Sequence, residues 1–218
     1  MEEIMTTREK IIHESLRLFS ERGYNGVSMR EIAAAVGIQG ASLYHHFKGK
    51  EDIFKEIFQE MTKHYDRFAE KMALPNEAGT EATEAYLQMD EPMLLQMTEA
   101  IFSFFTQDQF VVMFRRLILS EQNQSAIAAD CLREYYINAP LQFQTSILRG
   151  MLQSGAFCEA DAETMALHFY SPLFFTLYQY DLGADHQTCV EQLKKHVHWF
   201  CKIYKQDVDV LPTMAETG

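Results

Sequence analysis

Apolar residues recur at intervals of three and four along most of this chain, which is the period of an amphipathic α-helix. The pattern is clear at Ile12, Leu16 and Phe19 near the start, and it continues as a single stripe from Phe54 to Met72. The alternation of apolar and polar residues that predicts β-strands is nearly absent, and the chain has only five prolines to interrupt helices. We therefore predict an all-α protein.

The segment that begins at Ser28 predicts two short helices joined by a tight turn. Ser28 and, three residues later, Glu31 form a capping box, which satisfies free amide groups at the start of a helix. Gly37 can adopt a positive φ and so end this helix with a sharp change of direction, and Ile38 is then expected in the corner. A second helix follows over residues 40–47.

The second short helix is expected to expose most of its side chains. Only Leu43 and Phe47 stand at positions that point toward a core. A short exposed helix with aromatic and hydrogen-bonding side chains suits a DNA groove. The alternative is an ordinary corner between two helices, but a Tyr-His-His triplet followed by Lys48 and Lys50 favours DNA binding. The outward positions are Gln39, Ala41, Ser42, Tyr44, His45 and His46.

This region also carries a specific set of residues. They are Ile32-Ala33, Gly37-Ile38, the run LYHHFKGKE at residues 43–51, Ile53-Phe54, and the preceding run FSERGYNGVS at residues 19–28. Across residues 6–55 the chain thereby resembles the DNA-binding head of the tetracycline-repressor (TetR) family. The resemblance implies an all-helical, homodimeric transcriptional regulator, usually a repressor. It also implies a variable C-terminal body that often binds a small molecule and releases the DNA.

The candidate DNA contacts divide by chemistry into phosphate contacts and base contacts. Many family members have a serine or threonine in place of Gln39 and a side chain in place of Gly40, so the operator sequence does not follow from the resemblance. Lys48 and Gly40 belong to the predicted interface as a whole. The predicted phosphate contacts are Ser28, Tyr44, His45 and Lys50. The predicted base contacts are Arg30, Gln39, Ala41, Ser42 and His46, since arginine suits guanine and glutamine suits adenine.

The net charge of −12 is unusual for a DNA-binding protein, but it is unevenly distributed. Residues 1–60 have 8 basic and 10 acidic side chains, a net of −2, so the remaining −10 lies in the rest of the chain. Between Arg22 and Lys50 there are four basic residues and one acidic residue, a local +3. Because an acidic body repels DNA, we expect binding to depend on few contacts and to weaken steeply with salt.

The chain is predicted to have a DNA-binding head and a helical body. A long helix over residues 50–72 joins the two, so a shift of its far end would move the head. The predicted division is a helix-turn-helix DNA-binding domain at residues 1–49, a ligand-binding and dimerisation domain at residues 50–205, and a flexible tail at residues 206–218.

The body is rich in methionine and aromatic residues, and loops are expected at residues 73–80 and 89–92. With 16 Phe, 10 Tyr and 12 Met in the chain, residues 93–119 hold more large side chains than one helix face can use. Each of them can be ordinary core, but together they suggest an adaptable apolar cavity, because Met and aromatic residues repack around varied ligands. The candidate pocket residues are Met97, Glu99, Phe102, Phe105, Met113, Phe114, Tyr135, Tyr136, His168 and Phe169.

The last two predicted helices have the pattern of a helix-packing interface. Two such helices from each of two chains would form a four-helix interface, as the resemblance also implies, and a palindromic operator would match its two-fold symmetry. The alternative is a monomer that uses these helices internally. The predicted dimer-interface residues are Phe169, Leu173, Leu177 and Tyr180 in one helix, and Val190, Leu193, Val197, Phe200 and Tyr204 in the next.

Catalytic, metal and membrane signals are weak in this sequence. It has no GxSxG, GxGxxG, P-loop or HExxH motif, and we expect no enzyme activity, cofactor or metal. The four cysteines, without a CxxC pair, predict reduced structural thiols: Cys131, Cys158, Cys189 and Cys201. The longest apolar stretch is shorter than the roughly 20 residues of a membrane span, so we expect a cytoplasmic protein.

Two alternatives to an effector-released repressor stay open at this point. One is a DNA-binding protein of the same fold that responds to a partner protein or works without a ligand. The more remote one is a hydrolase or transferase whose body cavity places Cys131 or Cys158 beside a histidine.

Overall fold

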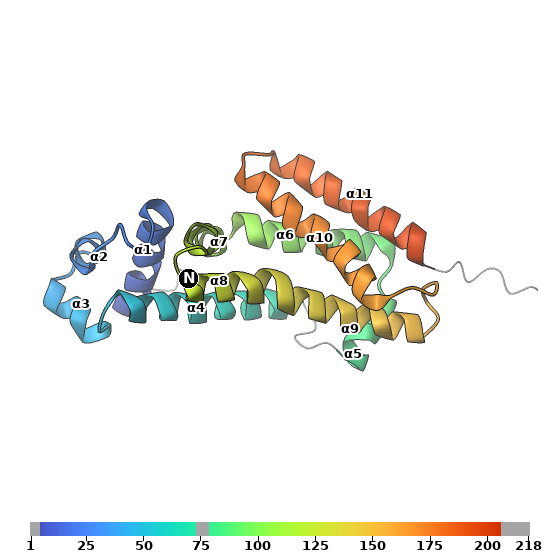
Figure 1. The fold of residues 1–218 in the computed structure, drawn as a ribbon, viewed down its shortest axis with the longest axis horizontal. Helices are drawn as coiled ribbons and strands as arrows, with labels where there is room; N and C mark the ends of the chain where they lie inside the picture. Colours follow the sequence, from blue (N-terminus) through green and yellow to red (C-terminus); the bar gives the residue numbers. More distant parts are fainter. Residues whose placement is uncertain (1–4, 73–78, 206–218) are drawn as a thin grey trace, which may run out of the picture. The chain divides into compact units, whose positions relative to one another are not determined.

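The computed structural model describes residues 5–72 and 79–205, and the elements in these ranges are helices (Figure 1). The all-α prediction is confirmed. Close contacts divide the chain into two compact units. The first unit is formed by Met1–Asn76 with Ala100–Pro140, and the second by Glu77–Glu99 with Leu141–Gly218.

The head of the first unit has three helices, whose ends agree with the sequence signals. Ser28 and Glu31 form the predicted capping box, with each side chain bound to the other residue's amide. Gly37 ends the second helix in the left-handed region, with a φ of 76°, which a glycine adopts without strain. Ile12, Leu16 and Phe19 are buried on the first helix, as predicted. The three helices are α1 (Thr7–Arg22), α2 (Met29–Val36) and α3 (Gly40–His46).

The first unit also contains three further helices, residues 100–107 and residues 134–140, and a row of aromatic rings joins two of these helices to the head. Neighbouring rings in this row have centroids between 4.8 and 6.3 Å apart. The row packs the first helix of the head against residues 50–71 and residues 109–121. Its members are Phe19, Tyr24, Phe54, Phe58 and Phe114. The further helices are α4 (Lys50–Lys71), α7 (Gln109–Glu121) and α8 (Ala126–Arg133).

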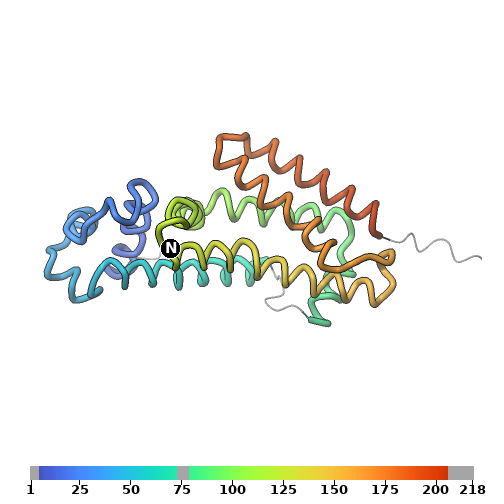
Figure 2. The backbone as a smooth tube through the Cα atoms, in the orientation of Figure 1, coloured from blue at the N-terminus to red at the C-terminus, as the bar shows by residue number. Residues whose placement is uncertain are grey.

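The second unit is built around the last two helices, which lie side by side in Figure 2 and pack on each other. An isolated bridge between Phe157 and Lys205 joins the segment before α10 to the end of α11. The helices of this unit are α5 (Thr80–Leu87), the first part of α6 (Glu91–Gln107), most of α9 (Ala139–Gln153), α10 (Ala162–Asp181) and α11 (His186–Tyr204).

The start of α6 corrects the predicted loop at residues 89–92. Oδ1 of Asp90 accepts a hydrogen bond from the Met93 amide at 2.9 Å, so Asp90 caps a helix that already begins at Glu91. Pro92 then lies in the first turn, where the missing N–H of proline costs little because that amide has no helical partner.

Two further features of the body depart from the sequence pattern. The crowded residues 93–119 are divided between α6 and α7 at Asp108, whose side chain accepts from the Val111 amide and caps α7. Between α8 and α9, a π-helical turn at Glu134–Asn138 contains Tyr135 and Tyr136. The apolar periodicity gives no sign of this turn, because it inserts one residue into an otherwise regular helix.

Some predictions lie outside the described residues or concern function alone. Residues 73–78 of the predicted loop and the predicted tail at residues 206–218 lie outside the described ranges. The predicted boundary between the DNA-binding domain and the body, at residues 49/50, does not coincide with the division into units, because α4 and α7 pack on α1. This boundary stays a prediction about function. Within the described part of the chain, no helix has both the length and the apolar character to cross a membrane.

Candidate nucleic-acid interface

Helix α3 presents to solvent most of the side chains that the sequence places toward DNA. Leu43 and Phe47 are buried and fasten the helix to the head core, as predicted. Tyr44 is 58% exposed, which is high for a large aromatic side chain in a packed head. Gln39, Gly40, Ala41 and His45 are also exposed, whereas Ser42 and His46 are half-buried.

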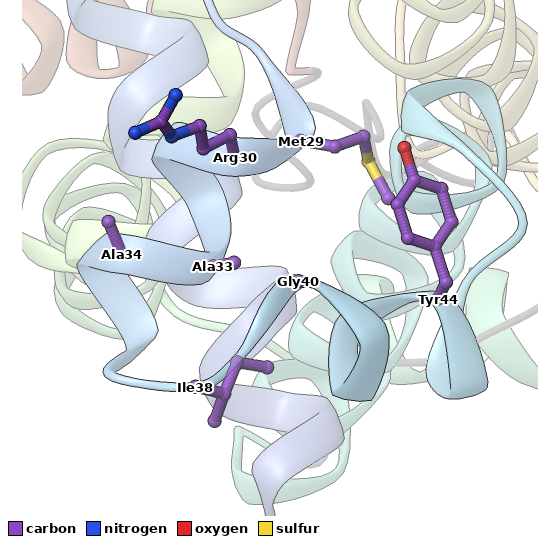
Figure 3. A pocket seen from close by; sticks show the side chains of 7 residues that line it. All are labelled: Met29, Arg30, Ala33, Ala34, Ile38, Gly40 and Tyr44. Atoms are coloured by element: carbon purple, nitrogen blue, oxygen red, sulfur yellow. The ribbon is translucent and has the colours of Figure 1, made fainter.

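A hollow of about 310 Å³ lies between α2 and α3 (Figure 3). Met29 and Tyr44 extend toward one another on one side of it, and Gly40 contributes no side chain to its wall. Ile38, which the sequence places in the corner between the helices, is half-buried and lines the hollow. The lining residues are Met29, Arg30, Ala33, Ala34, Ile38, Gly40 and Tyr44.

The basic side chains near this face differ in how free they are to bind phosphate. Arg30 and Lys48 are exposed, and Arg30 has no ion pair or hydrogen bond to other residues in the described ranges. Lys50 is half-buried: its ammonium donates to the Tyr24 carbonyl at 2.7 Å and lies 4.4 Å from the centroid of the Tyr24 ring. Two of its three N–H donors remain for a phosphate. Arg22 is paired with Glu31 at 2.5 Å, so it adds little to the local positive charge.

The prediction that Ser28 contacts phosphate stays a prediction, and in the free head its hydroxyl is bound to Glu31. The hydroxyl donates to Oε2 of Glu31 at 2.7 Å and accepts from the Glu31 amide at 3.3 Å. A serine has one O–H donor, and here the cap already uses it. Ser28 therefore fixes the start of α2, and through α2 the position of Arg30.

Glu31 gives the head a pH-dependent contribution to stability. The Arg22 guanidinium and then the Ser28 hydroxyl and amide lower the pKa of the Glu31 carboxyl from 4.5 to about 2. Because the pKa is lower in the folded state, ionised Glu31 stabilises the head above pH 4.5, and this contribution is lost as the pH falls toward 2.

We expect Glu31→Gln to be less stable than the wild type at pH 7, with a difference that shrinks as the pH falls from about 4.5 to about 2. Urea unfolding of both proteins at several pH values measures the difference between their free energies of unfolding. A difference that stays the same from pH 7 to pH 3 would contradict the assignment.

Two long-range contacts that the sequence does not reveal hold the end of α3 and the turn after α1 in place. The Arg8 guanidinium donates to the His46 carbonyl at 3.1 Å, pairs with Glu56 at 3.0 Å and lies 4.4 Å from the Phe47 ring centroid. It thereby joins the end of α3 to α1 and α4. Nothing in the spacing of Arg8 distinguishes it from an ordinary exposed arginine.

The second contact joins the turn after α1 to the end of α7. Glu121 is buried, and its Oε1 accepts a hydrogen bond from the Tyr24 amide at 2.9 Å. Tyr24 in turn packs on Phe54 of α4 with ring centroids 4.8 Å apart. A displacement of the end of α7 would therefore displace the turn that leads into α2.

The candidate pocket residues are spread over both units. In the first unit, Phe102, Phe114 and Tyr136 are fully buried. The Tyr135 hydroxyl is 2.5 Å from that of Thr62 on α4. Phe105 and Met113, also in this unit, are half-buried. Met97, Glu99, His168 and Phe169 belong to the second unit, where Glu99 pairs with Lys194, and Nδ1 of His168 lies 3.0 Å from the Tyr204 hydroxyl.

The predicted dimer seam on α11 is largely used within the chain itself. Leu177, Val190, Leu193, Val197 and Phe200 are each at most 3% exposed, so they leave almost no surface for a partner. The other four predicted residues, Phe169, Leu173, Tyr180 and Tyr204, are half-buried. The apolar side chains that the second unit leaves exposed on these two helices and at the end of α10 are Leu167, Phe175, Tyr178, Leu182, Trp199 and Ile203.

The chemistry of the remaining polar groups gives no support to the enzyme alternative. Within residues 5–72 and 79–205, no three His, Cys, Asp or Glu side chains are grouped as a metal site. Burial and the nearby Asp130 raise the pKa of the Cys131 thiol to about 11, which is unfavourable for a nucleophile. The Cys158 thiol donates to the Ile203 carbonyl, and Cys189 and Cys201 are buried.

Comparison with known proteins agrees with this geometry. Residues 11–57, which include α2 and α3, match the family model of bacterial regulatory proteins of the tetR family. The probable HTH-type transcriptional regulator YttP of Bacillus subtilis is 24% identical over 218 residues, which cover 98% of this chain and 96% of that protein. The head of this chain is a TetR-family DNA-binding domain. The chain is a DNA-binding transcriptional regulator.

Two further relatives show how far the similarity extends. IcaR of Staphylococcus epidermidis, a negative regulator of the biofilm operon icaADBC, is 36% identical over 61 residues, which cover 28% of this chain and 33% of IcaR. The solved SmeT–triclosan complex has the same fold, with a TM-score of 0.66 over 98% of this chain and 99% of SmeT, at 16% identity. The TetR fold thus extends over nearly the whole chain, whereas the similarity to IcaR is local.

Proposed function

We propose that this TetR-family regulator represses transcription by binding a palindromic operator as a homodimer, and that a small apolar or amphipathic effector releases it. The observation that carries the proposal is the exposed α3, with Tyr44 and His45 facing outward on a firmly packed head. The similarity to IcaR, a negative regulator, supports repression. The protein would act in the cytoplasm, where bacterial DNA lies, without a cofactor.

The proposed DNA contacts follow from which groups are exposed. Tyr44, His45, Lys48 and Lys50 would bind phosphate and set the register of α3 in the major groove. Arg30 would read guanine, since its guanidinium is exposed and has five N–H donors. Gln39, Ala41, Ser42 and His46 are the remaining proposed base contacts.

The proposed dimer uses the outer faces of α10 and α11. Phe175, Tyr178 and Leu182 are more than half exposed at spacings of three and four along α10 and its end, and Trp199 and Ile203 are similarly exposed on α11. Several large apolar side chains exposed on two neighbouring helices favour an interaction surface. A second copy of the same two helices would cover it under two-fold symmetry.

The proposed release works through α4, which begins directly after the reading head. Within the first unit, the Thr62 hydroxyl meets Tyr135 in the π-helical turn, and Nδ1 of His64 lies 3.1 Å from Asp108. An effector that displaced Tyr135 would break a contact that holds α4 and so shift the head. The effector would have to bind the DNA-binding conformation and the released conformation with unequal affinity. SmeT, which shares the fold, is solved in complex with triclosan, which supports a small-molecule effector.

Selection of bound sequences from random duplex DNA at moderate salt, with the mass of the complex recorded, tests this function. We expect the purified protein to recover a palindrome and to bind it as a dimer, with an affinity that falls steeply as salt rises. The recovered operator then serves in a release assay for candidate effectors. Folded protein that recovers no sequence, or binds as a monomer, would contradict the proposal.

A further inference from the structure

We propose that the hollow between α2 and α3 receives the 5-methyl group of a thymine in each operator half-site, and that Gly40 determines this specificity by keeping the hollow open. This inference rests on the proposed DNA binding and adds to it the identity of one base that the head reads. Gly40 has no side chain with which to contact a base, so its role would be to leave space.

Neither the backbone nor the packing requires a glycine at position 40. Gly40 is the first residue of α3, and its φ lies outside the positive range that favours glycine. A Cβ atom at this position would meet no other atom within 4 Å, so an alanine would fit without a clash. Glycine is less favourable in a helix than alanine. What Gly40 provides is open space beside α2.

The lining of this space suits an apolar group. Ala33 and Ala34 leave room on the α2 side, and the side chains of Met29 and Ile38 are apolar. Among the groups that base pairs present in the major groove, the thymine 5-methyl is the apolar one. A phosphate or a sugar hydroxyl would find few hydrogen-bond donors in this wall.

DNA is favoured over a free apolar ligand because the hollow shares its rim with the proposed DNA contacts. Arg30 and Tyr44 both line it, and both are exposed. Lys48 lies two residues after the end of α3, and the stretch from Arg22 to Lys50 has a net charge of +3 within a chain of −12. Arg30 and Tyr44 are the strongly polar hydrogen-bond donors among the lining residues. The Arg30 guanidinium suits a base edge and the Tyr44 hydroxyl suits a phosphate, on either side of the methyl group.

Replacement of each thymine of the selected operator by deoxyuridine tests the proposal, since it removes the methyl group and keeps every hydrogen-bonding group of the base. We expect one thymine in each half-site at which this change weakens binding about fourfold, or about fifteenfold when both half-sites are changed. The other thymines should respond much less.

Variants at Gly40 identify the place where the methyl group binds. In Gly40→Leu a large apolar side chain would take up space in the hollow beside α2, so thymine and uracil operators should bind with nearly equal affinity. Gly40→Ala, which fills less space and suits a helix, should show an intermediate ratio. Ala35→Leu is the matched control, because Ala35 is exposed on α2 and does not line the hollow, and its thymine-to-uracil ratio should equal that of the wild type.

The outcomes separate this inference from the proposed function. If the wild type binds no DNA, the proposed function fails and this inference with it. If the wild type binds an operator but no thymine is sensitive to loss of its methyl group, only this inference is overturned. The same holds if Gly40→Ala and Gly40→Leu keep the wild-type ratio. An apolar small molecule that competes for the hollow without such a thymine would also overturn it.

Discussion

Tyr44→Ala is expected to lower operator affinity by at least about 100-fold without unfolding the head. A hydrogen bond from the phenol to a phosphate contributes about 1.5 kcal/mol or more, and a dimer makes two of them. Together they amount to about 3 kcal/mol, which corresponds to roughly two powers of ten in affinity. Because Tyr44 is 58% exposed, its replacement should change the free energy of unfolding by less than about 1 kcal/mol. Titration of the operator and thermal unfolding of both proteins measure the two effects.

Tyr44→Phe is the matched control for this variant. It keeps the ring beside Met29 and removes only the hydroxyl, so it isolates the phosphate contact from the packing of the hollow. We expect Tyr44→Phe to account for most of the loss seen with alanine. Wild-type affinity in Tyr44→Ala would show that α3 does not enter the groove by this face, and the assignment of the reading helix would then be wrong.

The parts of the head that the sequence predicts well depend on neighbours along the chain. The cap at Ser28 joins residues three positions apart, and Gly37 ends its helix through its own φ. Such interactions are visible in a sequence because both partners fall within one turn. The predicted phosphate contact of Ser28 stays a prediction, and the structure adds that the Ser28 hydroxyl donates to Glu31 in the free head.

The contacts that fix the head in the first unit are not visible in this way. Arg8 reaches the His46 carbonyl across 38 positions, and Glu121 reaches the Tyr24 amide across 97. Each partner is an ordinary residue in its local context. A single sequence has no periodicity that links them, so only the folded chain reveals that α1 is bound to the end of α3 and that α7 is bound to the turn after α1.

Helical periodicity also fails to distinguish a buried stripe from a partner-facing one. The steps of three and four at Val190, Leu193 and Val197 correctly predict a packing face on α11, but that face is buried within one chain. The face proposed for the partner carries Trp199 and Ile203, which follow the polar residues His198 and Lys202 in the sequence. Both faces have the same helical period, and only the tertiary structure shows which face is buried within the chain and which is exposed.

Phe175→Glu is expected to convert the dimer to monomers and to abolish operator binding. Phe175 is 57% exposed in the single chain, so the change should leave the fold of the second unit intact. In the proposed dimer it would place two carboxylates in an apolar interface, where an unpaired charge costs several kcal/mol. We expect the dimer dissociation constant to rise at least about 100-fold, which corresponds to roughly 2.7 kcal/mol. A lone head would bind one half-site too weakly to hold the operator.

Trp199 provides a direct measurement of this change, because it is the single tryptophan of the chain and is 59% exposed on α11. Dimer formation would bury its indole and shift its emission to shorter wavelength, so dilution of the wild type should reverse the shift as dimers dissociate. Phe175→Glu should emit at the longer wavelength at every concentration. Met93→Glu, a similarly exposed residue of the same unit that lies on α6, is the control and should behave as the wild type. A Phe175→Glu protein that remains dimeric by sedimentation, with unshifted Trp199 emission, would place the partner surface elsewhere on the molecule.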